Sequence, residues 1–405
     1  MSAWKQIGIC WLAVASAAVA GDWPHWRGPN GNGVSTESGW LDHWPDHGPP
    51  TLWKAQVGTG FASFAVAGGR VYTTGNENNK DTVFAFAADS GKALWKHSYE
   101  ADLGDKFFEG GTTSTPTVEG DRVYTFNRWG DVYCFAAADG AVIWQKNVHQ
   151  EAGLRVPGWG FGGSPTVFEN ELLLNAGEAG LALDKATGKL LWQSANKDSG
   201  YSTPLLFARD GKTLAIFSSG RGYGAVEPLT GKALWSIRWM TEFGVNASDP
   251  IVDRDRFFLS TGYGKGAGLF KLGAGDPEEV WKSKIMHNQF NSSVLLGGYL
   301  YGVDGDSTEP ATLKCVELAT GAEKWGQPGF GSGALIAADG KLITLNDHGE
   351  LAVAPATPEG FKPTARAQIL GGKCWTTPVL ANGRIYCRNA QGDVACLDVR
   401  PAGPH

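Results

Sequence analysis

Short runs of alternating apolar and polar residues, separated by turn residues, extend over most of the chain. Residues 113–147 show the pattern clearly, because the runs STPTV, RVYTFN, DVYCFA and AVIWQKN are separated by EGD, RWG and AADG. Alternation with a period of two predicts strands with one buried face, and the Gly and Asp residues between the runs predict tight turns. The segment therefore predicts four short antiparallel strands joined by hairpins.

The same unit recurs along the chain with a spacing of roughly 40–50 residues. Six copies end in a tryptophan, and these tryptophans are Trp95, Trp144, Trp192, Trp235, Trp281 and Trp325. A seventh copy without the tryptophan runs from Leu335 to about Ile369, and an eighth begins at Thr376 and stops at residues 396–399, before its last strand. The missing strand is expected at residues 51–58 (TLWKAQVG), which contain Trp53 and look like the end of a repeat.

Eight units of this kind predict an all-β fold, an eight-bladed β-propeller with four antiparallel strands per blade. The ring is expected to be closed by the N-terminal strand, which completes the last blade. Small residues open each unit, as in GSP at 163–165, and we expect them on inner strands that crowd around a narrow axis. The repeated tryptophan is expected on the outer strand, where its large apolar area fills the gap between blades.

The first twenty residues predict a signal peptide. Lys5 precedes the apolar run 7–15, and Ala18-Val19-Ala20 forms an A-x-A cleavage site before Gly21. No later apolar run approaches the roughly 20 residues that a membrane-spanning helix needs. We therefore expect a periplasmic or secreted protein without membrane insertion.

The domain boundaries follow from the repeats. Residues 21–50 are expected to lead into the ring, residues 51–399 to form it, and residues 400–405 to form a C-terminal tail.

The charge balance and one Gly-rich stretch of the sequence argue against nucleic acid and phosphate ligands. Lys and Arg total 35 against 41 Asp and Glu, so the net charge is −6. No basic stripe of the kind that phosphate backbones need is present, and we expect no nucleic acid partner. The Gly-rich stretch 262–268 (GYGKGAG) lies between two expected strands, which indicates a hairpin turn and not a phosphate-binding loop, because such a loop leads into a helix. A monomer is expected.

The string (L/V)-x-D/E-x-x-T/D-G-K-x-L-W resembles the repeat of the bacterial pyrroloquinoline-quinone (PQQ)-like, or quinoprotein-repeat, β-propeller family. The resemblance covers residues 51–399, and residues 22–35 (DWPHWRGPNGNGVS) also resemble the N-terminal segment of exported members. The family contains PQQ dehydrogenases and the non-catalytic propeller lipoprotein of the outer-membrane β-barrel assembly machinery. The resemblance thus implies an enzyme or a scaffold.

For a dehydrogenase the resemblance implies a calcium ion held by a carboxylate and an asparagine, a basic aspartate, a tryptophan below the quinone and commonly a pair of adjacent cysteines. The chain has no Cys-Cys pair, no C-x-x-C-H motif and short connections between its strands. We expect a non-catalytic binding or scaffold module of the bacterial cell envelope, with no catalytic residue, metal or cofactor. The expected partner is a protein segment or an envelope polymer. The alternative is a PQQ- and calcium-dependent alcohol or sugar dehydrogenase.

Ligand contacts are expected in the loops that enter the inner strands, because these loops cluster at one mouth of the channel. Large aromatic or polar residues replace the small ones there, and aromatic surface with a few polar groups suits a pocket. The candidates are Lys106, Glu109, Trp159, Tyr201, Asn246, Asn288, Asn291 and Trp375. Trp159 and Glu109 are the strongest. The alternative is that the polar groups solvate a water-filled channel and that the tryptophans cap the blades.

Overall fold

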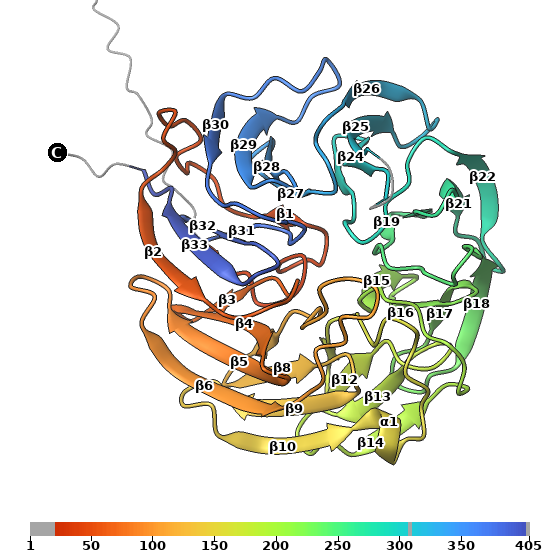
Figure 1. The fold of residues 1–405 in the computed structure, drawn as a ribbon. Coiled ribbons are helices and arrows are strands. Elements are labelled where there is room, and N and C mark those ends of the chain that lie inside the picture. The colour runs from red at the N-terminus through yellow and green to blue at the C-terminus, as the bar shows by residue number, and fades with distance from the viewer. Residues whose placement is uncertain (1–20, 307–309, 402–405) are drawn as a thin grey trace, which may run out of the picture.

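Eight β-sheets stand around a central axis in the computed structural model, which describes residues 21–306 and 310–401 (Figure 1). The predicted signal peptide and most of the predicted tail lie outside the described residues. In each blade, consecutive strands pair antiparallel from the axis to the outer edge. The eight-bladed propeller predicted from the repeats is confirmed.

The first four blades run from the inner to the outer strand in chain order. Blade 1 consists of β3 (Ala65–Ala67), β4 (Arg70–Glu77), β5 (Lys80–Ala87) and β6 (Ala93–Glu100). Blade 2 consists of β7 (Thr117–Glu119), β8 (Arg122–Phe126), β9 (Asp131–Ala136) and β10 (Val142–Asn147). Blade 3 consists of β11 (Thr166–Phe168), β12 (Glu171–Leu174), β13 (Leu181–Asp184) and β14 (Leu190–Gln193). Blade 4 consists of β15 (Leu205–Arg209), β16 (Lys212–Ser219), β17 (Gly222–Val226) and β18 (Ala233–Arg238).

The next two blades repeat this order. Blade 5 consists of β19 (Ile251–Asp253), β20 (Arg256–Thr261), β21 (Gly266–Lys271) and β22 (Glu278–Ser283). Blade 6 consists of β23 (Val294–Leu296), β24 (Tyr299–Asp304), β25 (Thr312–Glu317) and β26 (Glu323–Gln327). The stretch 262–268 forms the hairpin between β20 and β21, as its position between two strands predicted.

Blades 7 and 8 include strands from the N-terminal part of the chain. Blade 7 consists of β27 (Ala334–Ala338), β28 (Lys341–Leu345), β29 (Glu350–Pro355) and β30 (Ala365–Gln368), with β1 (Val34–Ser35) added parallel to β27 on the axial side. Blade 8 consists of β31 (Val379–Ala381), β32 (Arg384–Arg388) and β33 (Asp393–Asp398), and β2 (Thr51–Gln56) is its outer strand. The described helix is α1 (Val148–Glu151), capped by Asn147.

The ring closes between the two ends of the chain, as predicted. Strand β2 pairs antiparallel with β33, with Trp53 opposite Cys396. Arg388, which is fully buried, adds a second link between the last blade and the first, because its guanidinium donates hydrogen bonds to the carbonyls of Gly58 (3.1 Å), Ala62 (3.0 Å) and Thr74 (2.7 Å).

The repeated tryptophans lie on the outer strands, and most of them bind the next blade through the indole N–H group. The Nε1 atom of Trp95, for example, donates to the carbonyl of Ala137 at 3.0 Å. Trp53, Trp144, Trp192, Trp281 and Trp325 donate in the same way to Ala88, Lys185, Pro228, Leu318 and Thr357.

A glycine of the repeat provides the space for this contact. Gly140 has a φ of 75°, and a Cβ atom there would lie 2.6 Å from the ring of Trp95. Gly91 faces Trp53 in the same way. In blades 1 to 4 and 6, the glycine of the outer hairpin thus leaves room for the tryptophan of the preceding blade.

In the described part of the chain, no helix is long and apolar enough to cross a membrane.

Candidate functional site

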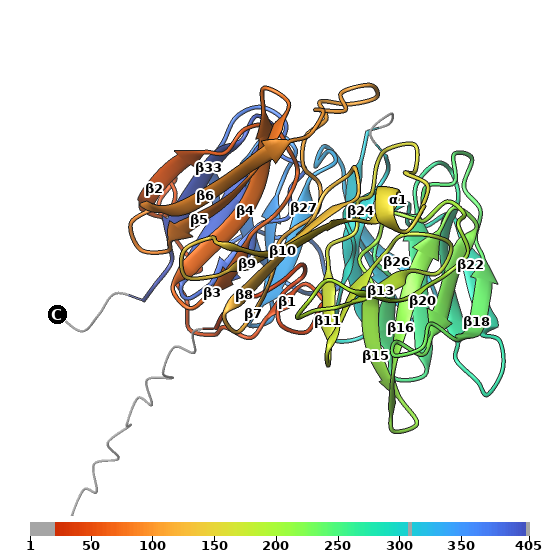
Figure 2. The same cartoon turned by 90° about the horizontal axis from the view of Figure 1, so that it is seen from below.

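The N-terminal segment closes one end of the channel. Trp23 pairs with Val66 of β3 through two backbone hydrogen bonds (2.8 and 2.7 Å), and the carbonyl of Pro24 accepts one from Val118 of β7 at 2.8 Å. Figure 2 shows β1, β3 and β7 close to one another at the same face of the ring. The segment therefore runs along the inner strands at the face opposite the loops in which the candidate residues lie.

Trp26 of this segment forms the floor of the channel with Asp249, which opens blade 5. The Trp26 Nε1 atom donates to the Asp249 carboxylate at 2.5 Å, the Thr203 amide donates at 2.8 Å and the Ser292 hydroxyl at 3.2 Å. Arg27 lies 3.9 Å from the same carboxylate. Burial raises the pKa of Asp249, and Arg27 and these hydrogen bonds oppose the shift only in part. The carboxylate is thus surrounded by donors within the protein.

Two cavities flank this floor, and Trp26, Thr203 and Asp249 line both. The smaller, of about 330 Å³, opens among His25, Pro29 and the ends of the inner strands of blades 2 to 4. The larger, of about 540 Å³, lies on the side of the candidate loops and is called the aromatic bowl here. Its aromatic lining residues are Trp26, Phe61, Phe107, Phe108, Trp159, Tyr201, Tyr263, Phe290 and Trp375.

The rings of the bowl contact one another in two groups. On one side the ring centre of Trp375 lies 5.7 Å from that of Phe61 and 4.8 Å from that of Phe290. On the other side Trp159 lies 5.4 Å from Phe107 and 6.1 Å from Tyr201. These contacts hold flat apolar surfaces on opposite walls of one cavity.

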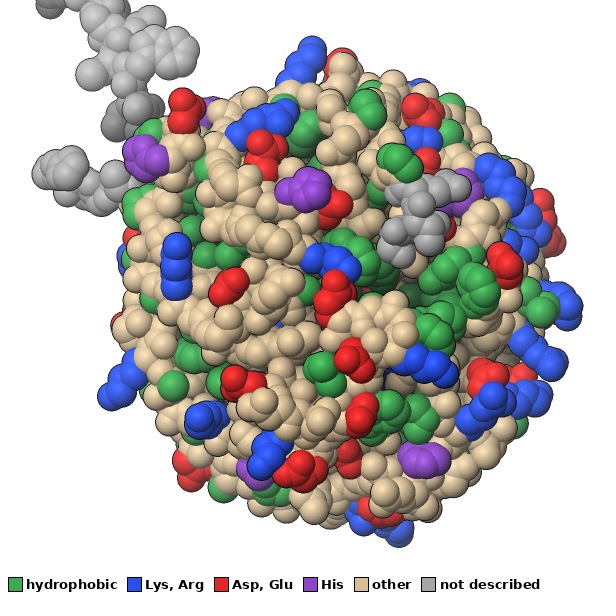
Figure 3. All heavy atoms as spheres, in the orientation of Figure 1, with side chains coloured by type: hydrophobic (Ala, Val, Ile, Leu, Met, Phe, Trp, Pro, Cys, Tyr) green, Lys and Arg blue, Asp and Glu red, His purple; other side chains and the backbone are tan. Residues whose placement is uncertain are grey.

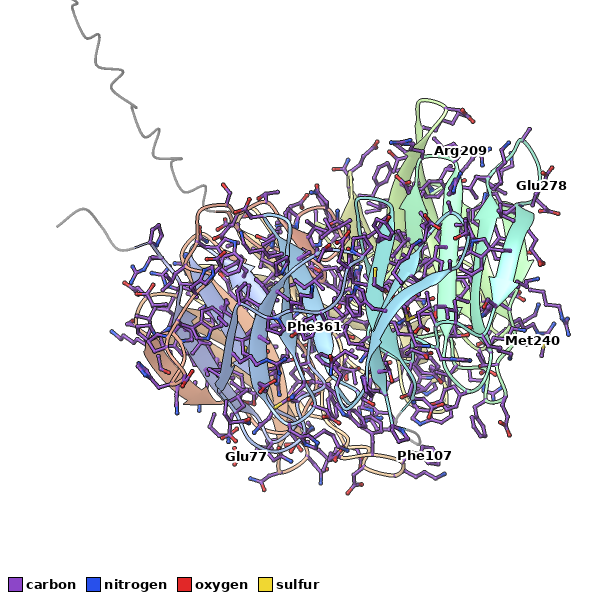
Figure 4. The ribbon with its side chains drawn as sticks, turned by 90° about the horizontal axis from the view of Figure 1, so that it is seen from above. Glu77, Phe107, Arg209, Met240, Glu278 and Phe361 are labelled. Carbon is purple, nitrogen blue, oxygen red and sulfur yellow. The ribbon has the colours of Figure 1, made fainter. Side chains whose placement is uncertain are left out.

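The bowl opens on the face seen in Figure 3, where hydrophobic side chains gather around a hollow. Phe107 is 58% exposed and projects from this face, opposite to the side from which Arg209 projects (Figure 4). Phe243 is 55% exposed and extends the aromatic rim, with its ring centre 6.3 Å from that of Trp159. Exposed apolar rings at a cavity mouth are typical of a binding site.

Lys373 and Glu109 form the charged group of the bowl. The Lys373 ammonium lies 4.1 Å from the ring centre of Trp375 and forms a short ion pair with the Glu109 carboxylate. Burial alone would raise the pKa of Glu109, but Lys373 lowers it overall. The second carboxylate oxygen of Glu109 is buried and has no hydrogen-bond donor among the described residues. Glu109 is therefore ionised at neutral pH, and its carboxylate holds the Lys373 ammonium at the wall of the bowl.

Arg128 holds the two loops of the rim together. Its guanidinium donates to the carbonyls of Leu103 (2.8 Å), Gly104 (3.1 Å) and Trp159 (2.9 Å) and lies 5.0 Å from the ring centre of Phe108. The loop that presents Phe108 and the loop that presents Trp159 are thus fixed by one side chain at the end of β8.

The structure brings three of the eight sequence candidates into the lining of the bowl, namely Trp159, Tyr201 and Trp375. Burial raises the pKa of Tyr201 to about 12, so its hydroxyl stays neutral. Glu109 reaches the bowl through Lys373. Lys106 is exposed beside the rim, with its ammonium 5.0 Å from the ring centre of Phe107. Ligand contact by these residues stays a prediction.

The three candidate asparagines differ from the expectation, because they lie in the wall of the ring and not in the lining. Each Nδ2 atom donates to backbone carbonyls, that of Asn246 to Ser219 (2.7 Å), that of Asn288 to Val303 (2.9 Å) and that of Asn291 to Ser332 (3.2 Å). Their chain neighbours Val245, Ala247, Gln289 and Phe290 line the bowl instead. The loops were located correctly, but within each loop the asparagine points into the wall of the ring and its neighbours point toward the bowl.

Sequence reasoning missed several lining residues, among them Phe61, Phe107, Phe108, Tyr263 and Phe290. Phe107, Phe108 and Phe290 lie in loops that the sequence had singled out, and their signal was the aromatic content of those loops. Trp26 and Asp249 had no such signal, because they meet only when the N-terminal segment reaches the axis.

Fold and site together define an eight-bladed propeller with an aromatic bowl on its axis. The comparisons add the family: a family model described as outer membrane protein assembly factor BamB matches residues 79–327, and the chain belongs to this family. BamB of Escherichia coli (strain K12) is 25% identical over 352 residues, which cover 73% of this chain and 86% of the relative. BamB of Yersinia pestis is 25% identical over 287 residues, which cover 63% of this chain and 66% of the relative.

Solved structures of two kinds share the fold. BamB from Moraxella catarrhalis aligns with a TM-score of 0.63 at 15% identity, over 88% of this chain and 99% of that one. Quinohemoprotein alcohol dehydrogenase from Comamonas testosteroni aligns with a TM-score of 0.68 at 12% identity, over 95% of this chain and 82% of that one. Both likenesses concern the fold alone.

The residues of the bowl do not fit a calcium-bound quinone. Ca²⁺ takes six to eight oxygen ligands, whereas Asp249 is the one carboxylate among the described lining residues, and its oxygens already accept three hydrogen bonds. Neither Asn246 nor Asn288 lines the bowl, and the Nδ2 atom of each donates to a backbone carbonyl of the ring wall. No group of three or more His, Cys, Asp or Glu side chains that could hold a metal occurs among the described residues.

Proposed function

We propose that this protein is an exported, non-catalytic binding or scaffold module of the cell envelope, and that the aromatic bowl holds a segment of a protein partner. The observation that carries the proposal is the bowl itself, a cavity of about 540 Å³ with opposed aromatic walls and a floor whose carboxylate is already bonded. A cavity of this kind offers apolar surface and few free polar groups, which suits binding more than proton or electron transfer.

The lining favours a protein segment over an envelope polymer. Phe61, Phe107, Phe108 and Phe290 carry no hydrogen-bonding group, so much of the wall offers only apolar contact, whereas a polysaccharide requires many donors and acceptors. An apolar or aromatic side chain would lie between Trp375 and Trp159, and a backbone carbonyl of the segment would reach the Lys373 ammonium, which lines the bowl and is held by Glu109. The relatives are described as outer membrane protein assembly factors, which supports a protein partner and a periplasmic location. We propose that the protein is a monomer.

The proposal is tested with a blocked peptide in which phenylalanine and serine alternate, titrated into the purified protein while its tryptophan fluorescence is followed. Trp159→Ala removes one wall of the bowl and Glu109→Gln removes the carboxylate that holds Lys373. Each is expected to raise the Kd of the peptide at least about tenfold, equivalent to about 1.4 kcal/mol, with little change in melting temperature.

Trp192→Ala is the matched control, because this tryptophan lies on an outer strand, bonds to the next blade and does not line the bowl. It is expected to lower the melting temperature and to leave the Kd unchanged. The proposal is wrong if both bowl variants unfold the protein yet leave the affinity intact, because Trp159 and Glu109 would then be structural plugs of the channel.

The dehydrogenase alternative has its own test. The purified protein is incubated with Ca²⁺ and PQQ, and the absorption spectrum is recorded after gel filtration. A retained quinone band that disappears in Trp375→Ala would favour the quinoprotein over the scaffold.

A further inference from the structure

Four cationic side chains form a cluster at the outer edge of the ring, where blade 4 meets blade 5. They are called the basic corner here and comprise Arg238 of β18, Lys265 of the β20–β21 hairpin, Lys282 of β22 and Lys284. The ammonium groups of Lys265 and Lys282 lie 4.9 and 5.7 Å from the ring centre of Trp239, and that of Lys284 donates to the carbonyl of Lys265 at 3.3 Å. Figure 3 shows Lys and Arg side chains gathered at this edge.

The positive charges of the basic corner are incompletely balanced. Glu279 pairs with Lys282 at 2.5 Å, but Arg238, Lys265 and Lys284 have no carboxylate within 4 Å among the described residues. The pKa of Lys265 is lowered, first by burial and then by repulsion from Lys282, Lys284 and Arg238. A cluster of cations that repel one another gains free energy when an anion binds among them. This excess of positive charge is local to the basic corner, since the whole chain has a net charge of −6.

Exposed apolar side chains lie on the same two outer strands as Arg238 and Lys282, or directly after them. Val280 is 50% exposed and precedes Lys282 on the outward side of β22, and Leu234 is 39% exposed and precedes Arg238 on β18. Met240 is 42% exposed and lies at the end of this edge nearer the open face, whereas Glu278 lies at the opposite end (Figure 4). Basic residues mixed with exposed apolar residues are typical of proteins that bind the surface of an anionic bilayer.

We propose that the basic corner is a docking surface for a bilayer containing anionic phospholipids, which the protein binds at its surface without inserting. The outer strands β18 and β22, which present Arg238 and Lys282, are on the convex outer rim of the ring (Figure 1), so the corner can contact a flat, extended surface. Arg238, Lys265, Lys282 and Lys284 bind lipid phosphates, and Val280, Leu234 and Met240 enter the interface. This surface is separate from the aromatic bowl.

The experiment measures co-sedimentation of the mature protein with sucrose-loaded vesicles of phosphatidylcholine, with and without phosphatidylglycerol at one third of the lipid. We expect binding to the anionic vesicles alone, and a steep decrease between 50 and 300 mM NaCl, because about 1 kcal/mol per cation is electrostatic. The triple variant Lys265→Gln, Lys282→Gln, Lys284→Gln is expected to lower the partition coefficient at least about tenfold.

The matched control replaces three exposed lysines on other blades, Lys54, Lys96 and Lys189, by glutamine. It removes the same net charge and is expected to retain most of the binding. The proposal is overturned if the two triple variants lose binding equally, which would indicate net charge alone, or if the wild type does not bind the anionic vesicles. It is also overturned if soluble poly-glutamate binds the corner as tightly as vesicles of equal anionic charge do, because the partner would then be an acidic macromolecule.

Discussion

Among the buried ionisable residues, Asp81 is placed where its charge affects stability. It is 3% exposed and lies between blades 1 and 2, where its two oxygens accept hydrogen bonds from the amides of Asn76 (2.8 Å) and Asn127 (3.1 Å). Burial raises the pKa of Asp81 to about 6, and the amides and the nearby charge of Arg128 only partly oppose this shift. The carboxyl group therefore titrates near neutral pH.

We predict that Asp81→Asn changes how the stability depends on pH. The pKa is 3.8 in the unfolded chain and about 6 in the folded protein, so the folded state binds this proton more tightly. The stabilisation is fully present below pH 3.8 and is lost as the pH rises through 6. Relative to the Asn variant, the wild type is expected to lose roughly 3 kcal/mol between pH 3.5 and 7.

Urea unfolding at four pH values across this range measures the difference between the two proteins. Other carboxylates titrate in both proteins and cancel in the comparison. Parallel stability curves would show that Asp81 does not carry the pH dependence.

At the scale of the element, the outer hairpin of blade 5 departs from the repeat. In six blade-to-blade contacts the indole N–H of the preceding blade finds a carbonyl just after the third strand, as Trp95 does at Ala137. The segment between β21 and β22 has no T-G turn, and the Nε1 atom of Trp235 is buried without an acceptor among the described residues. The interface between blades 4 and 5 therefore has the tryptophan but lacks the hydrogen bond that the six other tryptophans make.

This difference predicts that replacing tryptophan by phenylalanine lowers the free energy of unfolding by different amounts at two similarly buried positions. Trp95 is 8% exposed and Trp235 is 7% exposed. Trp95→Phe removes a hydrogen bond and leaves the Ala137 carbonyl with only the longer one from the Tyr72 hydroxyl (3.4 Å), whereas Trp235→Phe removes an unpaired donor. Trp95→Phe is expected to lower the free energy of unfolding by about 1 kcal/mol more than Trp235→Phe. Chemical denaturation of both variants measures their free energies of unfolding. Equal decreases in the two variants would mean that packing, and not the hydrogen bond, determines the effect of the substitution.

For the whole molecule, stability depends on closure between distant parts of the chain. Strand β2 covers the outer edge of β33, and Trp53 of β2 donates to Ala88 of blade 1 at 3.0 Å. A short N-terminal strand thus joins the last blade to the first. Without it, β33 would present an unpaired edge and the adjacent blades a gap of tryptophan size.

We predict that deleting residues 21–57 lowers the melting temperature far more than the length of the segment suggests. Trp53→Ala is the milder test and is expected to cost roughly 3–5 kcal/mol. Leu52→Ala is the control, because Leu52 is partly exposed at the bulge beside Trp53. Calorimetry of the three variants measures the effect, and a truncated protein that melts cooperatively at the wild-type temperature would contradict closure by β2.

The architecture was predictable from the sequence because the same pattern of strands and turns occurs in eight copies along the chain. Alternation predicted the strands, and the copies of Trp95 indicated how blades pack. The incomplete last repeat, together with residues 51–58, predicted the closure, and the pairing of Trp53 with Cys396 confirms it. Loops that break the repeat also indicated which mouth of the channel holds the bowl.

Only the tertiary structure decided which side chains of those loops face the bowl. Asn246 and Asn288 differ from their neighbours Val245 and Gln289 by one position, and the path of each irregular loop sets which of the two side chains faces the bowl. The floor was also beyond sequence reasoning, since Trp26 and Asp249 are 223 residues apart. The sequence by itself determined the repeated strands and the repeated tryptophan contacts, because each of them depends on a local pattern. The bowl consists of residues that depart from the repeat, and these residues come together only when the whole ring closes.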